Sequence, residues 1–464
     1  MGAFYLFSYW FGFAILCILL LIASAFLGYC LYVKYIHLKY DHIPGPPRDS
    51  FLFGHAPTMI EETRSGRNLH DKFLQWSEMY GPVYRINSLH MVIIGVTCPE
   101  ATKEILMSPK YPKDKLLYAR LFNLFGVRFL GSGLVSATNH EQWYKQRRIM
   151  DPAFSTLYLR GLMGTFNERA ENLMDELTKL ADSKKEAKMH QLLSRVTLDV
   201  ITKVAFGMDL DLVNNDSPFL KAIETCLKGM VANLRDLFFQ YKQKNRPFIK
   251  EVREACQFLR TTGEDWISKR RTAVQNGEDV PKDILTQIIK SAGQGCDTNT
   301  ILQNCNTALV ILQFLVSVTR GLRLFFLLVL KETLRLYPSA PGLSREVSSD
   351  ITIAGYDIPG GTIQMFDTYV NGRMDKFFKD PLTFDPDRFH PDATKPYYCY
   401  FPFALGARSC LGQKFAQMEA KVVMAKLLQR FDFSLVPGQS FDILDTGTLR
   451  PKSGVVCNIK HRDQ

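Results

Sequence analysis

The sequence predicts a mainly α-helical α+β domain with small β-sheets at its edge, carried behind a single N-terminal membrane anchor. After residue 140, apolar residues recur at spacings of three and four, as on the buried face of an amphipathic helix. Short apolar runs typical of strands lie mostly in the first third of the chain. The chain has 464 residues, 46% of them hydrophobic, and no internal repeat, so we expect one large core.

The N-terminal segment has the composition of a membrane anchor. Residues 1–33 contain no charged side chain, and the apolar stretch from Trp10 to Val33 exceeds the ~20 residues that span a bilayer. Basic residues follow directly, among them Lys34 and Lys39, so the positive-inside rule places the rest of the chain in the cytosol. The alternative is a signal peptide cleaved at Ala23-Ser24-Ala25. Because no lysine or arginine precedes the apolar run, which continues past that site, we predict an uncleaved anchor.

A basic, proline-rich linker is expected over residues 34–48, ending in Ile43-Pro44-Gly45-Pro46-Pro47-Arg48. Consecutive prolines hold an extended chain, so this segment forms a stiff hinge. Residues 49–464 then form a single domain.

Local patterns place the regular elements of that domain. Strands are predicted at Val83–Ile86, Met91–Ile94 and Ile351–Ala354. Apolar residues on one face mark two helices. The first contains Leu198, Ile201 and Ala205 and ends at Gly207. The second contains Phe415, Met418, Val422 and Ala425.

The charge and the cysteines narrow the class of protein. The net charge of +11 comes from 57 basic and 46 acidic residues. The positive charges are scattered, whereas nucleic-acid binding needs basic clusters with interleaved stacking aromatics, so we expect no nucleic-acid partner. A membrane surface and an acidic redox partner account better for the excess. The ten cysteines include no Cys-x-x-Cys pair, and in a reducing cytosol we expect free thiols.

One cysteine lies in a loop of unusual composition. Cys410 follows Phe403, Gly406 and Arg408, and Gly412 separates it from a strongly helical segment. A thiolate in such a loop is stabilised by backbone N–H groups and by the positive end of the following helix. The glycines permit close approach, the arginine can bind a carboxylate, and the phenylalanine can shield the sulfur from water. The alternative is that Cys410 is a small buried hydrophobe among ordinary turn residues.

This loop resembles the heme-binding signature Phe-x-x-Gly-x-Arg-x-Cys-x-Gly of the cytochrome P-450 superfamily and matches it at every fixed position. The resemblance implies a helical heme domain with small edge sheets and a heme-thiolate monooxygenase activity over residues 49–464. It implies heme b as the cofactor, with Cys410 as the catalytic thiolate ligand of its iron; such a ligand favours O–O cleavage. Arg408 is expected to reach a heme propionate, Phe403 to pack against the ring plane, and Gly412 to complete the loop.

Further motifs resemble the same family. Glu332 and Arg335 share a helix face, and Arg388 lies in a proline-bounded loop. Alone, Glu-x-x-Arg is usually a solvated surface pair. With Arg388 it resembles the family's Glu-Arg-Arg triad, whose role is structural.

Two other motifs imply contacts to the heme propionates. Trp143 and Arg147 are four residues apart on one helix face, which suits a carboxylate clamp. They resemble the family's Trp-x-x-x-Arg helix, which holds a propionate. Arg345 matches the position of another propionate-binding arginine. Lys145, Arg148 and Lys414 flank these segments, and either dock a flavoprotein reductase or belong to a generally solvated basic surface.

Longer stretches resemble a sterol-metabolising branch of the family, notably residues 41–48, 281–288 and 400–438. This resemblance implies hydroxylation of the cholesterol side chain at carbon 24, with dioxygen and electrons from an NADPH-dependent flavoprotein reductase. It also implies a single-pass protein of the endoplasmic reticulum membrane with a cytosolic catalytic domain. Leu121–Phe125 and Leu237–Phe239 fall in regions that resemble pocket segments, although such apolar clusters are more often plain core.

One departure bears on activity. The family places an acid–alcohol pair midway along a long helix, where it delivers protons to bound dioxygen. Between Asp283 and Glu332 the only acidic residue is Asp297, which comes too early in the chain and suits an N-cap for a helix starting near Thr300. The apolar stretch Ala308–Leu330 then reaches the Glu332 helix several dozen residues sooner than the family pattern does.

Several alternatives therefore stay open. The chain is a splice or gene-model variant of an active hydroxylase, a folded heme protein without proton delivery, or a misassembled membrane protein. A non-catalytic heme- or sterol-binding protein is a further alternative, as is a related heme-thiolate enzyme that acts on fatty acids or drugs.

Overall fold

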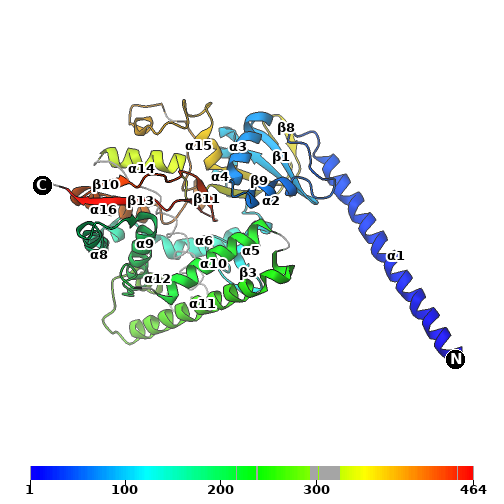
Figure 1. Ribbon diagram of the computed structural model, residues 1–464, viewed down its shortest axis with the longest axis horizontal. Helices are drawn as coiled ribbons and strands as arrows, with labels where there is room; N and C mark the ends of the chain where they lie inside the picture. Colours follow the sequence, from blue (N-terminus) through cyan, green and yellow to red (C-terminus); the bar gives the residue numbers. More distant parts are fainter. Residues whose placement is uncertain are drawn as a thin grey trace.

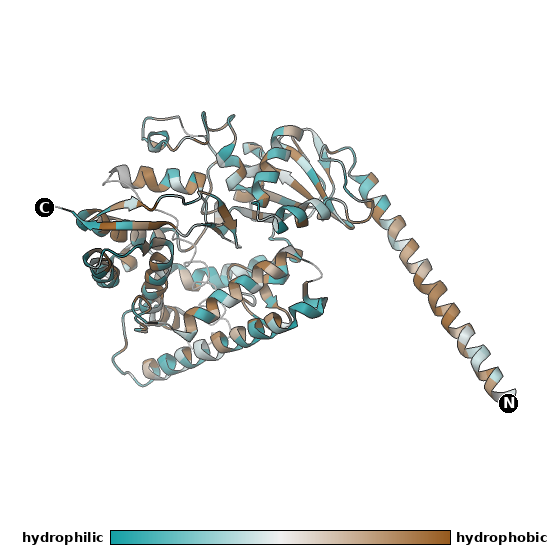
Figure 2. Ribbon diagram, viewed as in Figure 1, coloured by the Kyte–Doolittle hydropathy of each residue, from teal (hydrophilic) through white to brown (hydrophobic). Residues whose placement is uncertain are grey.

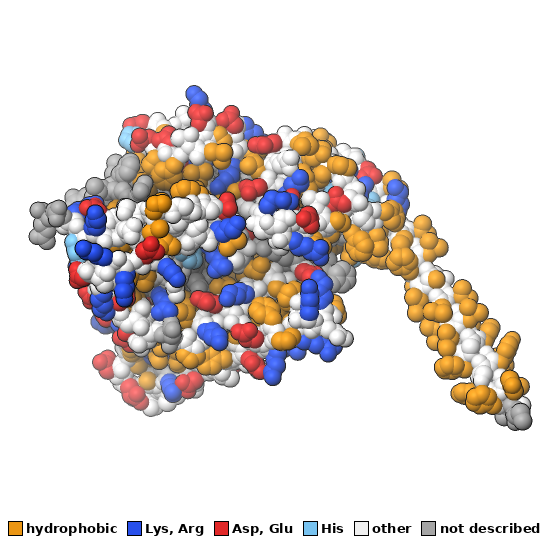
Figure 3. Space-filling model, in the orientation of Figure 1, with side chains coloured by type: hydrophobic (Ala, Val, Ile, Leu, Met, Phe, Trp, Pro, Cys, Tyr) orange, Lys and Arg blue, Asp and Glu red, His pale blue; other side chains and the backbone are white. Residues whose placement is uncertain are grey.

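The computed structural model describes residues 2–215, 217–236, 239–292, 301, 324–394, 396–446 and 448–462. Helix α1 (Gly2–Lys39) projects from the rest of the molecule as a straight rod (Figure 1). Its apolar side chains are exposed along most of its length (Figures 2 and 3). Over Phe4–Lys39 it is long and apolar enough to cross a membrane. The helix continues past Val33 to Lys39, so the first part of the predicted linker is helical, and residues 44–48 have no regular secondary structure.

The base of α1 is attached to the turn between two strands. The Tyr29 hydroxyl lies 3.1 Å from Nδ1 of His90, and Nε2 of His37 lies 2.9 Å from the carbonyl oxygen of Leu89. These contacts fix the end of the rod against the domain.

Helices make up most of the domain, as predicted. They are α2 (Ala56–Arg64), α3 (Leu69–Tyr80), α4 (Pro99–Met107), α5 (Lys115–Phe122), α6 (His140–Met150), α7 (Thr156–Gly161), α8 (Met163–Asp182), α9 (Met189–Phe206), α10 (Pro218–Arg235), α11 (Arg246–Gln275), α12 (Ile284–Ala292), α14 (Leu324–Leu336), α15 (Thr368–Arg373) and α16 (Gln413–Arg430). Short 3-10 turns occur at Asp151–Phe154, Phe239–Tyr241, Gln243–Asn245, Pro386–Phe389 and Gly406–Arg408.

The largest sheet has four strands in the order β1-β2-β9-β6. They are β1 (Val83–Ser88), β2 (Met91–Val96), β9 (Ile363–Asp367) and β6 (Gly342–Glu346). β2 pairs antiparallel with β1 and parallel with β9, while β6 runs antiparallel to β9 with Arg345 opposite Gln364. The two strands predicted in the first third of the chain are thus confirmed.

The other sheets are smaller. The strands β10 (Phe431–Leu435), β13 (Val456–His461) and β5 (Ala187–Lys188) form one sheet, and three hairpins pair β3 (Asn123–Leu124) with β4 (Val127–Arg128), β7 (Ile351–Ile353) with β8 (Tyr356–Ile358), and β11 (Ile443–Asp445) with β12 (Leu449–Pro451). β7 confirms the third predicted strand.

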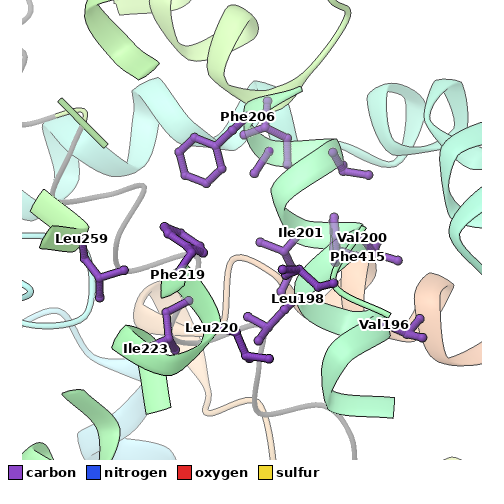
Figure 4. Close-up of a cluster of buried hydrophobic side chains, with 14 of the residues drawn as sticks. Val196, Leu198, Val200, Ile201, Phe206, Phe219, Leu220, Ile223, Leu259 and Phe415 are labelled. Atoms are coloured by element: carbon purple, nitrogen blue, oxygen red, sulfur yellow. The ribbon is translucent and has the colours of Figure 1, made fainter. Parts of the chain in front are cut away.

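The main core lies between the helices, where side chains of α9, α10, α11 and α16 meet (Figure 4). Leu198 and Ile201 of α9 are buried there, as their spacing predicts. Gly207 ends α9 in the left-handed conformation with φ of 67°, which favours glycine.

The predicted apolar face of α16 is only partly right. Phe415 is buried, but Met418, Val422 and Ala425 are half-buried. The buried positions also include Glu419 and Leu427. One apolar stripe does not describe this helix because it packs on two sides, against α8 and against a second cluster that contains α14 residues.

A histidine ion pair ties α3 to the large sheet and carries a testable pH dependence. Nδ1 of His70 lies 2.5 Å from Oδ2 of Asp367, and Nε2 lies 3.5 Å from Oδ2 of Asp445. Burial alone lowers the pKa of His70, but the two carboxylates outweigh it and raise the pKa to about 10. The stabilisation is therefore complete below pH 6.5, the ordinary histidine value, and is lost as the pH rises towards 10.

We expect His70→Gln to lower the free energy of unfolding by at least ~1 kcal/mol at pH 6 and by progressively less as the pH approaches 10. Denaturant unfolding of the detergent-solubilised protein at both pH values measures this. His461→Gln is the matched control, because the His461–Asp182 pair is half-exposed. A pH-independent effect of His70→Gln would contradict the assignment.

Candidate functional site

The Cys410 loop lies between a 3-10 turn and the N-terminus of α16. Gly406 has φ of 68°, and a Cβ there would lie 2.8 Å from Cα of Met107 and closer still to the carbonyl oxygen of Leu106. Only glycine therefore fits where the loop packs on the end of α4. Gly412 precedes α16 with φ of −81°, which other residues also adopt.

The sulfur of Cys410 receives the backbone donors that the sequence predicts. The amides of Gly412 and Gln413 donate hydrogen bonds to it, and Arg147 and Lys113 contribute positive charge. Burial nevertheless raises the pKa of the thiol, and these contributions offset only part of that rise. The backbone N–H of Cys410 donates to the carbonyl oxygen of Phe403 at 2.8 Å and so closes the loop.

The expected clamp on α6 is arranged differently from its sequence pattern. Trp143 is buried, and the Arg408 guanidinium stacks over its ring at 4.2 Å. Arg147 instead donates through Nη1 to the carbonyl oxygen of Ser409 at 2.8 Å and pairs through Nε with Asp151 at 2.6 Å. Arg147 thus fastens α6 to the Cys410 loop, while Trp143 and Arg408 form the cation–aromatic pair.

Three buried or half-buried cations come together beside this loop. Arg345 is 2% exposed, and Lys113 is 9% exposed. Burial, followed by the charges of Arg345 and Arg408, lowers the pKa of Lys113 well below its ordinary value. Burial and the charge of Arg345 likewise lower the pKa of Arg408 to about 10. We call Lys113, Arg345 and Arg408 the cation cluster.

Sequence reasoning missed Lys113. Its Nζ donates to the carbonyl oxygen of Val135 at 2.6 Å and lies 4.6 Å from the centroid of the Tyr118 ring. No motif marks it, and a lysine beside Asp114, the N-cap of α5, has no feature that distinguishes it from surface lysines. Only the folded chain places it beside the two arginines.

Glu332 and Arg335 are buried and Arg388 is half-buried beside them. Glu332 and Arg335 therefore do not form a solvated surface pair. Nε and Nη2 of Arg335 each donate to a Glu332 oxygen at 2.7 Å, and both side chains are 0% exposed. Nε of Arg388 lies 3.5 Å from Oε1 of Glu332. Nη1 of Arg335 also donates to the carbonyl oxygen of Pro381 at 2.7 Å. The group joins α14 to the loop before the Cys410 segment.

The predicted apolar segment near residue 125 has a mixed role. Phe125 is buried and stacks on Phe239 at 5.7 Å between ring centroids. It also lines a hollow of about 580 Å³ together with Arg120 of α5 and Asn233 of α10. Residues 237–238 lie outside the described residues.

These features agree with a comparison against known families. The cytochrome P450 family model matches residues 44–316 and 325–458. The chain belongs to the cytochrome P450 family. The match contains the Cys410 loop, the cation cluster and the Glu332 group.

Similar proteins match most of its length at low identity. The chain is 26% identical to cytochrome P450 3A6 of Oryctolagus cuniculus, across 96% of this chain and 97% of the relative. It is 24% identical to cytochrome P450 4B1 of Rattus norvegicus, across 90% of each chain. It is 25% identical to cytochrome P450 4d2 of Drosophila melanogaster, across 82% of this chain and 87% of the relative.

The comparison with cytochrome P450 3A6 also indicates that this chain is internally shorter than that relative. The similarity to cytochrome P450 3A6 extends over 498 positions, more than the 464 residues of this chain, so the relative has residues with no counterpart here. The family match is interrupted between residues 316 and 325. This interruption lies within the Ala308–Leu330 stretch where the sequence predicts the shortening. Asp297, Thr298, Thr300 and most of that stretch lie outside the described residues; α14 begins at Leu324.

P450 proteins use heme and electrons from a reductase, and the residues present fit such a group. Buried cations are costly unless anions face them, and the cation cluster would hold the carboxylates of the heme. Cys410, with its backbone donors, would bind the iron. When bound, the heme supplies the centre at which dioxygen is reduced.

We expect Lys113→Met to weaken heme retention several-fold, because it removes one member of the cation cluster that would hold the heme carboxylates. The heme content per protein after gel filtration, and the rate of heme transfer to an acceptor protein, measure this without turnover. Lys110→Met is the matched control, since Lys110 is exposed on the same segment. Equal heme retention in the two variants would remove Lys113 from the site.

Proposed function

We propose that this protein is a membrane-bound heme-thiolate monooxygenase that hydroxylates a lipophilic substrate, the side chain of cholesterol at carbon 24. The observation that carries the heme assignment is the Cys410 loop, whose sulfur accepts amide hydrogen bonds at the start of α16 and lies near the cation cluster. The sterol assignment rests on the resemblance of residues 41–48, 281–288 and 400–438 to a sterol-hydroxylating branch of the family.

The proposed roles follow the contacts. Cys410 is the iron ligand and catalytic residue, with heme b as the cofactor. Arg345, Arg408 and Trp143 face the propionates, and Arg147 positions the Cys410 loop through the Ser409 carbonyl. Phe403 and Gly412 shape that loop, and Glu332, Arg335 and Arg388 hold the adjoining segment in place.

We place the protein in the endoplasmic reticulum membrane as a single-pass protein, with α1 as its anchor and the catalytic domain in the cytosol. Electrons would come from NADPH through a flavoprotein reductase. Lys145, Arg148 and Lys414 are exposed on α6 and α16, the helices that flank the Cys410 loop. Their positive charge suits an acidic redox partner. The acidic and basic side chains on the visible face are otherwise interspersed (Figure 3).

A second candidate is a non-catalytic heme- or sterol-binding protein, or an inactive splice or gene-model variant that lacks the acid–alcohol pair. The internal shortening favours it. The described residues between Asp283 and Glu332 contain no acidic side chain that could supply the family's acid–alcohol pair. Without that pair the chain would lack a source of protons for the oxygen chemistry, and we would expect the reductase's electrons to form hydrogen peroxide with little hydroxylated product.

The test reconstitutes the full chain in lipid vesicles with an NADPH-dependent reductase and cholesterol. We expect sterol product hydroxylated at carbon 24 in amounts far below the NADPH consumed, with hydrogen peroxide as the balance. Heme binding and tight sterol binding without any hydroxylated product would favour the non-catalytic candidate. Hydroxylation of fatty acids in preference to cholesterol would overturn the sterol assignment and keep the monooxygenase.

A further inference from the structure

Two cysteines meet inside the packed pair of helices α10 and α11. Sγ of Cys226 lies 3.4 Å from Sγ of Cys256, and both residues are buried, with 0% and 2% exposure. The two helices lie side by side along much of their length (Figure 1). The pair is thus enclosed in the core and belongs to neither the Cys410 loop nor the cation cluster.

The helix backbones approach closely at this point. A Cβ on Gly229, one turn after Cys226, would lie 2.6 Å from Cγ1 of Val252, one turn before Cys256. Buried residues on the other side of the thiols, Ile223 of α10 and Leu259 of α11, belong to the same apolar cluster (Figure 4). The antiparallel register therefore holds the two thiols opposite each other.

We propose that Cys226 and Cys256 are a peroxide-sensitive modification site that forms an intramolecular disulfide joining α10 to α11. A disulfide needs the sulfurs about 2.05 Å apart, so from 3.4 Å they must approach by roughly 1.4 Å. The site is a reduced dithiol in a reducing cytosol and is oxidised when hydrogen peroxide rises.

The reaction balances in two steps. The sulfur of one cysteine attacks hydrogen peroxide. An S–O bond forms and the O–O bond breaks, which gives a cysteine sulfenic acid and releases one water. The second sulfur attacks that sulfenic sulfur; the S–S bond forms, the S–O bond breaks, and a second water leaves. Two thiols lose two electrons and two protons, and peroxide is reduced to two waters. The hydrogen bond to Cys256, followed by burial, raises the pKa of Cys226, so little thiolate is present and we expect the disulfide to form only when peroxide is abundant.

The cross-link would restrain the walls of the 580 Å³ hollow. Nη1 of Arg120 in α5 donates to the carbonyl oxygen of Asn233 in α10 at 2.6 Å. Nε of Arg253 in α11 donates to the carbonyl oxygen of Phe125 at 2.8 Å. Because each helix holds one of these lining residues, Arg120 or Phe125, joining α10 to α11 would restrain the position of these two residues relative to each other.

The experiment treats the full-length protein in membranes with hydrogen peroxide, alkylates it under denaturing conditions and digests it without reduction. We expect mass spectrometry to find the Cys226 and Cys256 peptides joined, with the loss of two hydrogens, and separated again by dithiothreitol. Cys226→Ser and Cys256→Ser should abolish the joined species. Cys399→Ser, a control at another buried cysteine, should retain it.

A second readout is thermal unfolding. Oxidation should raise the midpoint of the wild type by at least about 3 °C, and should leave Cys226→Ser unchanged. Recovery of both cysteines alkylated singly, oxidised separately or linked to other cysteines would overturn the proposal. The proposal rests on the proposed function only for a source of peroxide in the cell. Because peroxide is added here and no turnover is measured, failure of this test and failure of the monooxygenase assignment are distinguishable.

Discussion

Replacing Cys410 with serine is expected to eliminate the strongly red-shifted Soret band of reduced, carbon-monoxide-treated membranes that express this chain. A serine hydroxyl stays protonated and is a much weaker donor to iron than a thiolate, which gives the band its position. The loop should keep its fold, because the Cys410 amide and the Gly406 carbonyl close it, and a serine oxygen can accept the hydrogen bonds that the Gly412 and Gln413 amides donate to the sulfur.

Cys399→Ser is the matched control for this experiment, since Cys399 is 2% exposed and lies in the segment that leads to the Cys410 loop. It should retain the band. A band at the same position in Cys410→Ser would show that another residue ligates the iron. Absence of the band in the wild-type chain would mean that the shortened chain does not assemble its heme site.

The second large effect is expected at the buried Glu332–Arg335 pair. Glu332→Ala should destabilise the domain by about 3–5 kcal/mol, because it leaves the buried Arg335 without its carboxylate partner. Arg335→Ala should destabilise it less, because Arg388 remains 3.5 Å from Glu332. Glu332 also accepts the backbone N–H of Asp385 at 2.9 Å, so its removal leaves that donor unpaired as well. Chemical denaturation of the solubilised protein, followed by circular dichroism, measures the change in free energy.

An exposed pair of the same spacing provides the comparison. Nζ of Lys179 lies 3.2 Å from Oε2 of Glu176, and their side chains are 66% and 28% exposed. Glu176→Ala should change stability by about 0–1 kcal/mol. Equal effects of Glu176→Ala and Glu332→Ala would contradict a structural role for the buried group.

Local sequence patterns predicted the parts of the fold whose partners are near in the chain. Strands β1, β2 and β7, the buried face of α9 and its stop at Gly207 follow from periodicity and turn residues within a few positions. The prediction for α16 was weaker, because a helix that packs on two sides has no single apolar stripe. The spacing of apolar residues along the sequence does not show how many other elements pack against the helix.

In the candidate site, too, the sequence predicted the local features but not the contacts between distant residues. The spacing of Phe403, Gly406, Arg408 and Cys410 is a local property, and the loop folds with the amide donors that this spacing predicts. The sequence places Trp143 and Arg147 on one helix face, but the indole pairs with Arg408, which is distant in the chain. Two residues on one helix face therefore need not bind the same group, because a side chain from another element can contact one of them instead.

By itself, the sequence determined the chemistry that this protein carries: an apolar N-terminal helix, a cysteine with its loop, and a shortened segment before Glu332. These depend on residue type and short spacing, which the chain retains whether folded or not. Only the tertiary structure decided that Lys113 joins Arg345 and Arg408, and that Cys226 faces Cys256. Such contacts join residues far apart in the chain, and they form because packing of the core brings separate helices and strands together.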